Sequence, residues 1–143
     1  MYYKLSLMAD YLKWFNELSS DDIALVGGKN ASLGELMRLG ANVPEGFAVT
    51  SHAYDKFIQT NGLTEFIERQ LADVDVNDVE KLEIASKGIR EKILEARFPK
   101  DLEDSIIDSY EKLCKRSQNG NVSCAVRSSA TAEDLPTASF AGQ

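Results

Sequence analysis

Cysteine, histidine and proline are scarce in this sequence of 143 residues, which has two cysteines, one histidine and three prolines. Cys114 and Cys124 form no CxxC pair, so no metal or redox motif is indicated. We expect two buried or half-buried thiols in a reducing cytoplasm. No run of ~18 apolar residues that would cross a membrane occurs. Lys4 and Asp10 interrupt the start of the chain, which excludes a secretory signal there.

Basic residues are also few, since 16 Lys and Arg stand against 23 Asp and Glu, giving a formal net charge of −7. This balance argues against nucleic acid or an anionic membrane as the main partner. An anionic ligand would instead need particular cations and backbone N–H groups.

The composition, 43% hydrophobic and 27% charged, is that of an ordinary globular domain. We predict an α+β (mixed α/β) fold. Apolar residues at spacings of three and four predict helices over most of residues 64–118, where charge is dense. Strands are predicted at residues 122–126 and 46–50, and more weakly at 14–18. The predicted helix caps are Thr50 or Ser51, Thr64, Asn77 and Asp101.

A glycine pair precedes an isolated lysine in residues 26–36, VGGKNASLGEL. Glycines let the backbone turn sharply and approach a ligand closely. The residues that follow have helical spacing, and a helix N-terminus with a nearby Lys29 favours a phosphate. The segment is not a Walker A loop, which would need Gly at Ile23 and Ser or Thr at Asn30. A plain glycine turn before a helix explains the same residues without a ligand.

A second isolated cation, Arg127, follows the predicted strand of residues 122–126 and enters a loop rich in hydroxyl groups. A guanidinium group offers a planar fork to a phosphate, and Ser and Thr add neutral donors. Alternatively, Arg127 pairs with Glu133 or Asp134 in the same turn.

Residues 136–143, PTASFAGQ, have the small side chains of a flap whose backbone N–H groups can surround phosphate oxygens. An ordinary surface loop has the same composition. The single histidine, His52, falls in the first turn of a predicted helix, where a phosphate-accepting or acid–base group is the alternative to the solvated residue that we expect. The sequence contains no Ser-His-Asp set, metal-ligand cluster or carboxylate pair with informative spacing.

Four segments resemble a known family in their order and spacing: residues 14–18 (WFNEL), 26–36, 43–50 (VPEGFAVT) and 125–143 (AVRSSATAEDLPTASFAGQ). Together they resemble the N-terminal nucleotide-binding region of the phosphoenolpyruvate synthase (pyruvate, water dikinase) family, within the wider pyruvate-phosphate-dikinase-like group. Rifampin phosphotransferases resemble the first and last segments as well, but WFNEL favours the synthase. Pyruvate, phosphate dikinases usually have a Met- and Gly-rich last segment, from which this sequence departs.

The resemblance implies the first lobe of an ATP-grasp-type fold, with the helices of about residues 64–118 as a helical hairpin insertion. Residues 1–143 would be the N-terminal part of the ATP-binding domain. Lys29 matches the family's lysine that contacts the ATP phosphates. Arg127 matches the arginine that binds the phosphates and supports transfer, so it is the candidate catalytic residue. The loop that closes over the phosphates adds the candidate ligands Ser128, Thr131, Ser139 and Gly142.

The resemblance also implies a reaction. In the family, ATP gives a pyrophosphoryl group to a histidine on a separate domain and leaves as AMP. One phosphate is then lost to water and the other passes to pyruvate, which gives phosphoenolpyruvate. This is a cytoplasmic kinase reaction of gluconeogenesis that uses ATP and Mg²⁺.

Several parts that this reaction needs are absent from the sequence. The Mg²⁺ ligands of the family lie in the second lobe, so we expect no metal ligands here. The C-terminal lobe, the phosphohistidine domain and the pyruvate-binding barrel would be partners outside the chain. We therefore expect a piece of a larger enzyme that is inactive alone. The alternatives are the corresponding part of a rifampin-type antibiotic phosphotransferase, or a stand-alone binding module without catalysis.

Overall fold

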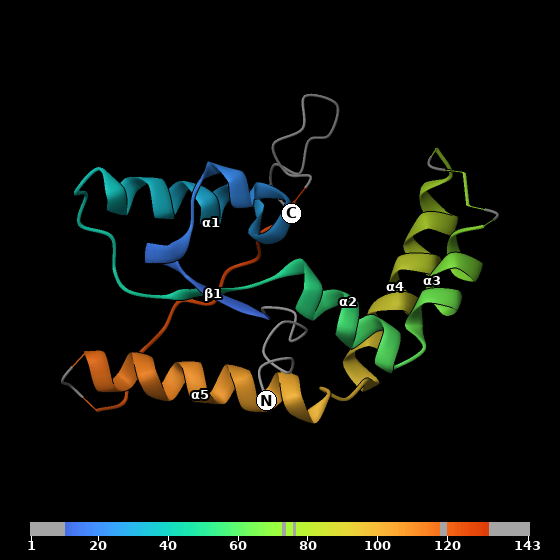
Figure 1. Cartoon of the computed structure of the whole chain (residues 1–143). Helices are drawn as coiled ribbons and strands as arrows, with labels where there is room; N and C mark the ends of the chain where they lie inside the picture. The colour runs from blue at the N-terminus through green and yellow to red at the C-terminus, as the bar shows by residue number, and fades with distance from the viewer. Residues whose placement is uncertain (1–10, 73, 76, 118–119, 132–143) are drawn as a thin grey trace, which may run out of the picture. The chain divides into compact units, whose positions relative to one another are not determined.

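The computed structural model describes residues 11–72, 74–75, 77–117 and 120–131. By its internal contacts the chain divides into two compact units, Met1–Tyr54 with Asp101–Gln143, and Asp55–Lys100. The described part is rich in helix and holds one small antiparallel sheet, which agrees with the predicted α+β class (Figure 1). None of the described helices combines the length and the hydrophobicity that a membrane span needs.

The sheet of the first unit pairs β1 (Leu12–Trp14) with β2 (Phe47–Val49) in antiparallel register, with Leu12 opposite Val49. Backbone hydrogen bonds extend the pairing at both ends, from the Thr50 N–H to the Tyr11 carbonyl and from the Phe15 N–H to the Gly46 carbonyl. The rings of Trp14 and Phe47 meet edge to face with centroids 5.6 Å apart. Such an aromatic cross-strand pair fixes the register of a short ribbon.

The strand predicted at residues 46–50 is confirmed, and the one predicted at 14–18 is wrong beyond its first residue. After Trp14 the chain forms a short 3-10 helix, Phe15–Glu17. The Glu17 carboxylate accepts a hydrogen bond from the Trp14 N–H at 3.0 Å and closes this turn. A local side-chain bond to the backbone thus replaces the ladder of a strand.

Helix α1 (Ile23–Arg38) and helix α5 (Lys100–Arg116) lie on opposite sides of the β1–β2 ribbon (Figure 1). The core under α1 consists of Leu18, Val26, Ala31 and Ala48, with Phe15 and Leu25 packed against it. A Cβ on Gly34 would lie 2.7 Å from the Cβ of Leu18, so α1 approaches the Leu18 backbone more closely than any larger residue would allow. On the other side, the Arg116 guanidinium stacks 3.9 Å from the Trp14 ring centroid.

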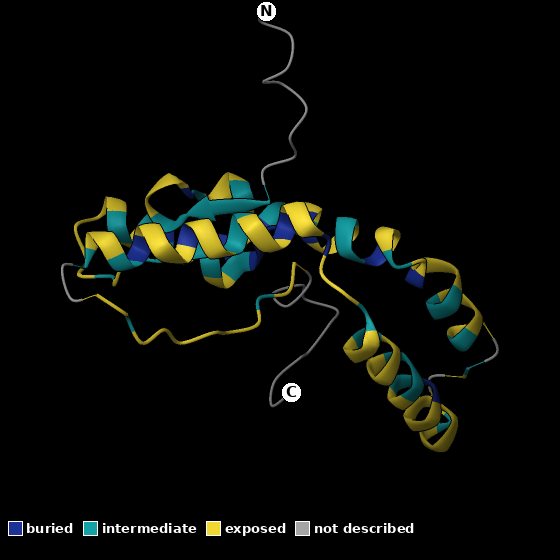
Figure 2. Cartoon of the chain, turned by 90° about the horizontal axis from the view of Figure 1, so that it is seen from below, coloured by how far each residue is buried: buried dark blue, intermediate teal, exposed yellow. Residues whose placement is uncertain are grey.

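The predicted apolar stripe of α5 is confirmed in outline. Leu102 and Leu113 are buried, and Ile106 is half-buried. Tyr110 is 37% exposed, but its hydroxyl donates a hydrogen bond to the Val122 carbonyl at 2.8 Å. Figure 2 shows the opposite face of α5 as mostly exposed residues.

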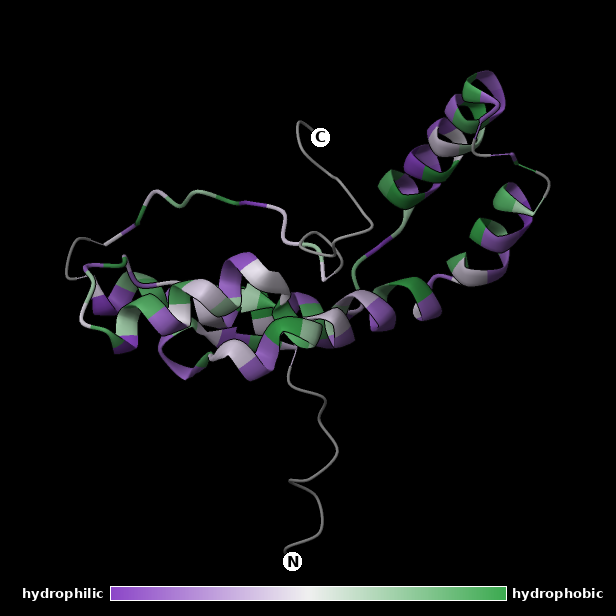
Figure 3. Cartoon of the chain, turned by 90° about the horizontal axis from the view of Figure 1, so that it is seen from above, coloured by the Kyte–Doolittle hydropathy of each residue, from purple (hydrophilic) through white to green (hydrophobic). Residues whose placement is uncertain are grey.

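The second unit packs α3 (Leu63–Leu71) against α4 (Val79–Glu95), after the end of α2 (Ser51–Thr60). Asn61 connects the end of α2 to the chain that follows α4. Its side-chain amide accepts a hydrogen bond from the Arg97 N–H and donates one to the Arg97 carbonyl. Figure 3 shows hydrophobic and hydrophilic residues alternating along both α3 and α4, as expected for amphipathic helices.

Only one of the predicted helix caps is confirmed. Thr50 accepts a hydrogen bond from the Ala53 N–H and caps α2. The prediction of Thr64 is wrong, since α3 follows the left-handed Gly62. Asp78, and not Asn77, caps α4, and Asp101 lies inside the first turn of α5. Neighbouring polar residues compete for each cap, and composition alone does not rank them.

Replacing Gly88 by alanine should stabilise α4. Gly88 lies inside this helix, and an added Cβ would only meet the Gln70 Oε1 at 3.7 Å, an ordinary contact. Alanine removes backbone freedom from the unfolded chain, so the free energy of unfolding should rise by about 0.5–1 kcal/mol. Urea unfolding of both variants measures this, and a lower midpoint for Gly88→Ala would contradict it.

The Lys13–Asp22 ion pair should make stability sensitive to acid. The Lys13 Nζ lies 2.7 Å from the Asp22 Oδ1, and their side chains are 26% and 16% exposed. The Lys13 ammonium first, and then the Ser19 N–H, hold the pKa of Asp22 below its usual value of 3.8. The pair therefore stabilises the fold above that value, and its contribution disappears as pH falls through the lowered pKa.

Lys13→Ala should cost about 0.5–1 kcal/mol at pH 7. Urea titration gives the free energy of unfolding of both proteins at pH 7 and at pH 3. Between these pH values it should fall less for Lys13→Ala than for the parent chain. Equal pH dependence of the two proteins would exclude this role for the pair.

Candidate functional site

The predicted glycine turn is a break within α1. Gly27 has φ 77° and ψ 160°, outside any helical conformation, so the helix stops at Val26 and restarts at Gly28. This combination of angles is essentially restricted to glycine. The restarted segment, residues 28–38, begins a new helix N-terminus with Lys29 in its first turn. The N–H groups of such a first turn have no intrahelical acceptor and carry partial positive charge.

The segment of residues 120–131 runs past this break. The Ser129 hydroxyl donates a hydrogen bond to the Val26 carbonyl at 2.8 Å, across 103 positions of sequence. A Cβ on Gly27 would collide with the Ser129 Oγ and would lie 2.8 Å from the Ala130 carbonyl oxygen. The structure thus brings together the two segments that the sequence singled out for their isolated cations.

The strand predicted at residues 122–126 is wrong. Residues 122–130 are extended but unpaired, and mostly exposed, with Val126 95% exposed (Figure 2). A strand needs a neighbour to bind its backbone groups, and the described residues offer none to this segment. Arg127 is therefore carried by an extended chain held at Val122 and Ser129, and not by a sheet.

Only some of the predicted site residues lie in the part of the chain that the structure describes. Lys29 is exposed on the first turn after the Gly27 break. Arg127, Ser128 and Thr131 are exposed on the segment that crosses the break. Ser139 and Gly142 lie outside the described residues, as do Glu133 and Asp134, the alternative partners proposed for Arg127. His52 is exposed in the first turn of α2, as predicted.

Two residues near the break were missed as candidates. Ser129 makes the contact between the two segments, while its neighbour Ser128 was chosen. Gly27 carries the break, yet the sequence assigned no separate role to either glycine of the pair. A Gly-Gly pair marks a place of close approach, but which distant residue approaches it is not encoded in local spacing.

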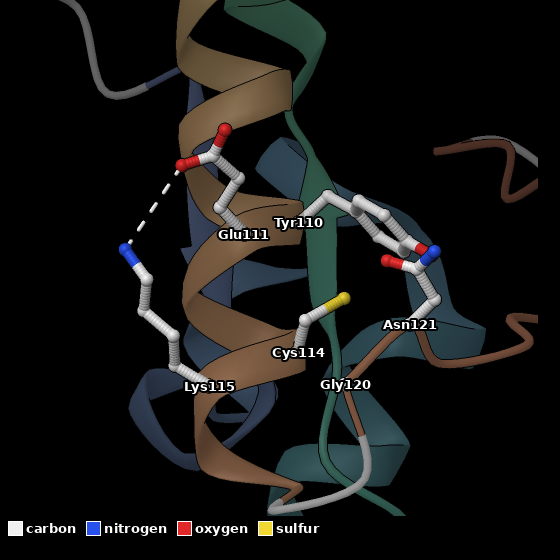
Figure 4. Close-up of a pocket in the computed structure, with 6 residues that line it drawn as sticks. All are labelled: Tyr110, Glu111, Cys114, Lys115, Gly120 and Asn121. Atoms are coloured by element: carbon white, nitrogen blue, oxygen red, sulfur yellow. Dashed lines mark ion pairs between the residues drawn. The ribbon is translucent and has the colours of Figure 1, made fainter.

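A separate hollow of about 400 Å³ lies beside α5 and contains none of the predicted ligands. Figure 4 shows Tyr110 and Cys114 on the side of the helix that faces Asn121, while Glu111 and Lys115 pair on the other side at 4.0 Å. The nearby Cys114 thiol raises the pKa of Tyr110. The Tyr110 hydroxyl donates to the Val122 carbonyl, which holds the start of the 120–131 segment.

Within the described ranges, no group of three or more His, Cys, Asp or Glu side chains could hold a metal ion. The residues around the break supply amide, hydroxyl, ammonium and guanidinium donors, which suit an anion and not a cation. The donor set at the break therefore does not fit Mg²⁺.

The break and the segment that crosses it lie within the part of the chain that matches a known family. Residues 23–143 match the family described as pyruvate phosphate dikinase, AMP/ATP-binding domain, and the chain belongs to this family. Proteins of similar sequence are named phosphoenolpyruvate synthases, which confirms the predicted resemblance.

A probable phosphoenolpyruvate synthase of Methanocaldococcus jannaschii is 51% identical over 93% of this chain and 11% of its own length. One of Methanothermobacter thermautotrophicus is 47% identical over 95% of this chain and 20% of its own length. The phosphoenolpyruvate synthase of Escherichia coli is 44% identical over 91% of this chain and 17% of its own length. The chain thus spans between a tenth and a fifth of the length of these relatives.

Proposed function

We propose that the chain is the phosphate-binding part of the ATP-binding domain of a phosphoenolpyruvate synthase, and that it forms the first lobe of an ATP-grasp-type fold. The observation that carries the proposal is the contact between Ser129 and Val26, which joins the glycine break to the segment bearing Arg127. The family match supports ATP as the ligand. A triphosphate requires several hydrogen-bond donors. The N–H groups at the break, the two exposed cations and the nearby hydroxyl groups can supply them.

The chemistry assigned to these residues is electrostatic. Phosphoryl transfer depends on positioning and on neutralising charge, and little covalent work falls to the binding domain. Lys29 acts as a point charge beside the first N–H groups of residues 28–31. Arg127 offers a planar fork to phosphate oxygens as negative charge develops on them, and Ser128 and Thr131 add neutral donors. Ser139 and Gly142 complete the proposed set.

The reaction of the whole protein is proposed by likeness to its relatives. ATP, pyruvate and water give AMP, phosphoenolpyruvate and phosphate, with a histidine on another domain carrying the transferred group. The second lobe, the phosphohistidine domain and the pyruvate-binding barrel are then partners of this chain. Mg²⁺, when bound, offsets the charge of the phosphates, and we place its ligands in the second lobe. The proposed compartment is the cytoplasm, and the proposed role is gluconeogenic.

Product analysis of the full-length protein tests this function. Incubation with ATP and pyruvate should give phosphoenolpyruvate, AMP and phosphate in equal amounts, whereas the 143-residue chain alone should give none. Formation of ADP in place of AMP, or phosphorylation of an acceptor other than pyruvate, would contradict the proposal. Phosphoenolpyruvate formation by the isolated chain would contradict the assignment of the missing partners.

A further inference from the structure

The Val26 carbonyl is the point at which the two cation-bearing segments are joined. It lies one residue before the Gly27 break and accepts two hydrogen bonds. The Asn30 side chain donates one from within α1, at 2.8 Å. The half-buried Ser129 hydroxyl donates the other, also at 2.8 Å, from the opposite end of the chain. The local bond shapes the break, and the long-range bond places the 120–131 segment on it.

The fit between the segments is too close to admit a larger side chain. The Ala130 carbonyl oxygen and carbon lie 2.8 and 3.2 Å from the position of a Cβ on Gly27. The Ser129 Oγ lies nearer still. Any side chain at position 27 would therefore displace the 120–131 segment from the break.

The segment is held at two points, and Arg127 lies between them. The Tyr110 hydroxyl holds the Val122 carbonyl at 2.8 Å, and Ser129 holds Val26. Arg127 is two residues before Ser129, which places their Cα atoms within about 7 Å. Lys29 is two residues after Gly27 on the restarted helix, about 3 Å further along its axis. The Ser129–Val26 bond therefore fixes the distance between the segment that carries Arg127 and the segment that carries Lys29.

We propose that Ser129 is a positioning residue for nucleotide binding. Its hydroxyl fixes the segment that carries Arg127 on the glycine break that places Lys29, so that both cations face one polyphosphate. This inference rests on the proposed ATP-binding function, and it assigns to Ser129 no contact with the ligand. The alternative is a bond that only stabilises the fold. The two differ because a positioning bond loses most of its effect on ATP once Arg127, the charged group that it positions, is removed.

A double-mutant cycle in the full-length protein separates these roles. The dissociation constant of ATP is measured by equilibrium titration for the parent protein, Ser129→Ala, Arg127→Ala and the double variant. Loss of one neutral hydrogen bond should weaken binding by about 3–10-fold in the parent background. In the Arg127→Ala background the same change should cost less than about 2-fold, since the positioned group is gone. Ser129→Thr, which keeps the hydroxyl, should bind ATP better than Ser129→Ala.

The matched control is Ser123→Ala, an exposed serine of the same segment, which should leave ATP binding unchanged. Equal losses from Ser129→Ala in both backgrounds, or no loss in either, would overturn the positioning role. The proposed function is tested separately, by including Lys29→Ala in the same ATP titration. If Lys29→Ala and Arg127→Ala also bind ATP normally, then the proposed binding site fails, and not only the role of Ser129.

Discussion

Replacing Arg127 by alanine in the full-length protein should weaken the use of ATP by roughly 10–150-fold in kcat/KM, because a hydrogen bond to a charged group contributes about 1.5–3 kcal/mol. Arg127 is exposed on an extended segment that crosses the Gly27 break. Its removal should leave the fold intact, since the segment is held by Tyr110 and Ser129 instead. The loss should therefore appear in ATP-dependent turnover and not in thermal unfolding.

Two further variants sharpen this expectation. Arg127→Lys keeps the charge but loses the planar fork, so its activity should fall between those of the parent and Arg127→Ala. Arg90→Ala removes the same charge from α4, in the other unit, and should leave turnover unchanged. Normal kcat/KM for Arg127→Ala would remove this residue from the site. Lys29→Ala should behave like Arg127→Ala, with its effect mainly on the KM for ATP.

Gly27→Ala should both destabilise the fold and remove ATP binding. The backbone at φ 77° and ψ 160° costs an alanine about 1–3 kcal/mol. The added Cβ would also collide with the Ser129 Oγ and crowd the Ala130 carbonyl, at a further ~1–3 kcal/mol. We expect a fall of about 2–5 kcal/mol in the free energy of unfolding, measured by urea titration, together with a loss of ATP binding.

Gly40 provides the matched control for this substitution. Its φ of 79° is nearly the same as that of Gly27, but no heavy atom lies within 4 Å of the position of its Cβ. Gly40→Ala should therefore cost only the left-handed backbone, about 1–2 kcal/mol, and leave ATP binding unchanged. If both variants lost the same stability, and both bound ATP, the close approach at Gly27 would have no energetic role.

The helices were the part of the fold that the sequence predicted best. Their apolar spacing is local, and burial of Ala85 in α4 and of Leu102 and Leu113 in α5 follows from it. The prediction of a strand at residues 122–126 failed because strand pairing is not local. The alternation of this segment is that of a strand, but pairing depends on a neighbour that the described residues do not provide. Glu17 ended β1 early through one side-chain bond, which no periodicity reports.

The candidate site was predictable as two halves and not as a whole. Lys29 and Arg127 were found because each stands alone among uncharged residues beside glycine or hydroxyl groups. Their segments are about a hundred positions apart, and local spacing does not state that they meet. The meeting depends on the Ser129 hydroxyl reaching the Val26 carbonyl and on Gly27 having no side chain in the way. Family likeness chose Ser128, the exposed neighbour, instead.

The central claim is that the Gly27 break and the 120–131 segment together bind the phosphates of ATP. A crystal structure of the full-length protein with a non-hydrolysable ATP analogue tests it most directly. We predict phosphate oxygens within hydrogen-bond distance of the Lys29 ammonium, the Arg127 guanidinium and an N–H group of residues 28–31, with the Ser129–Val26 bond retained. Phosphates bound away from the break, with Lys29 and Arg127 both turned to solvent, would contradict the account.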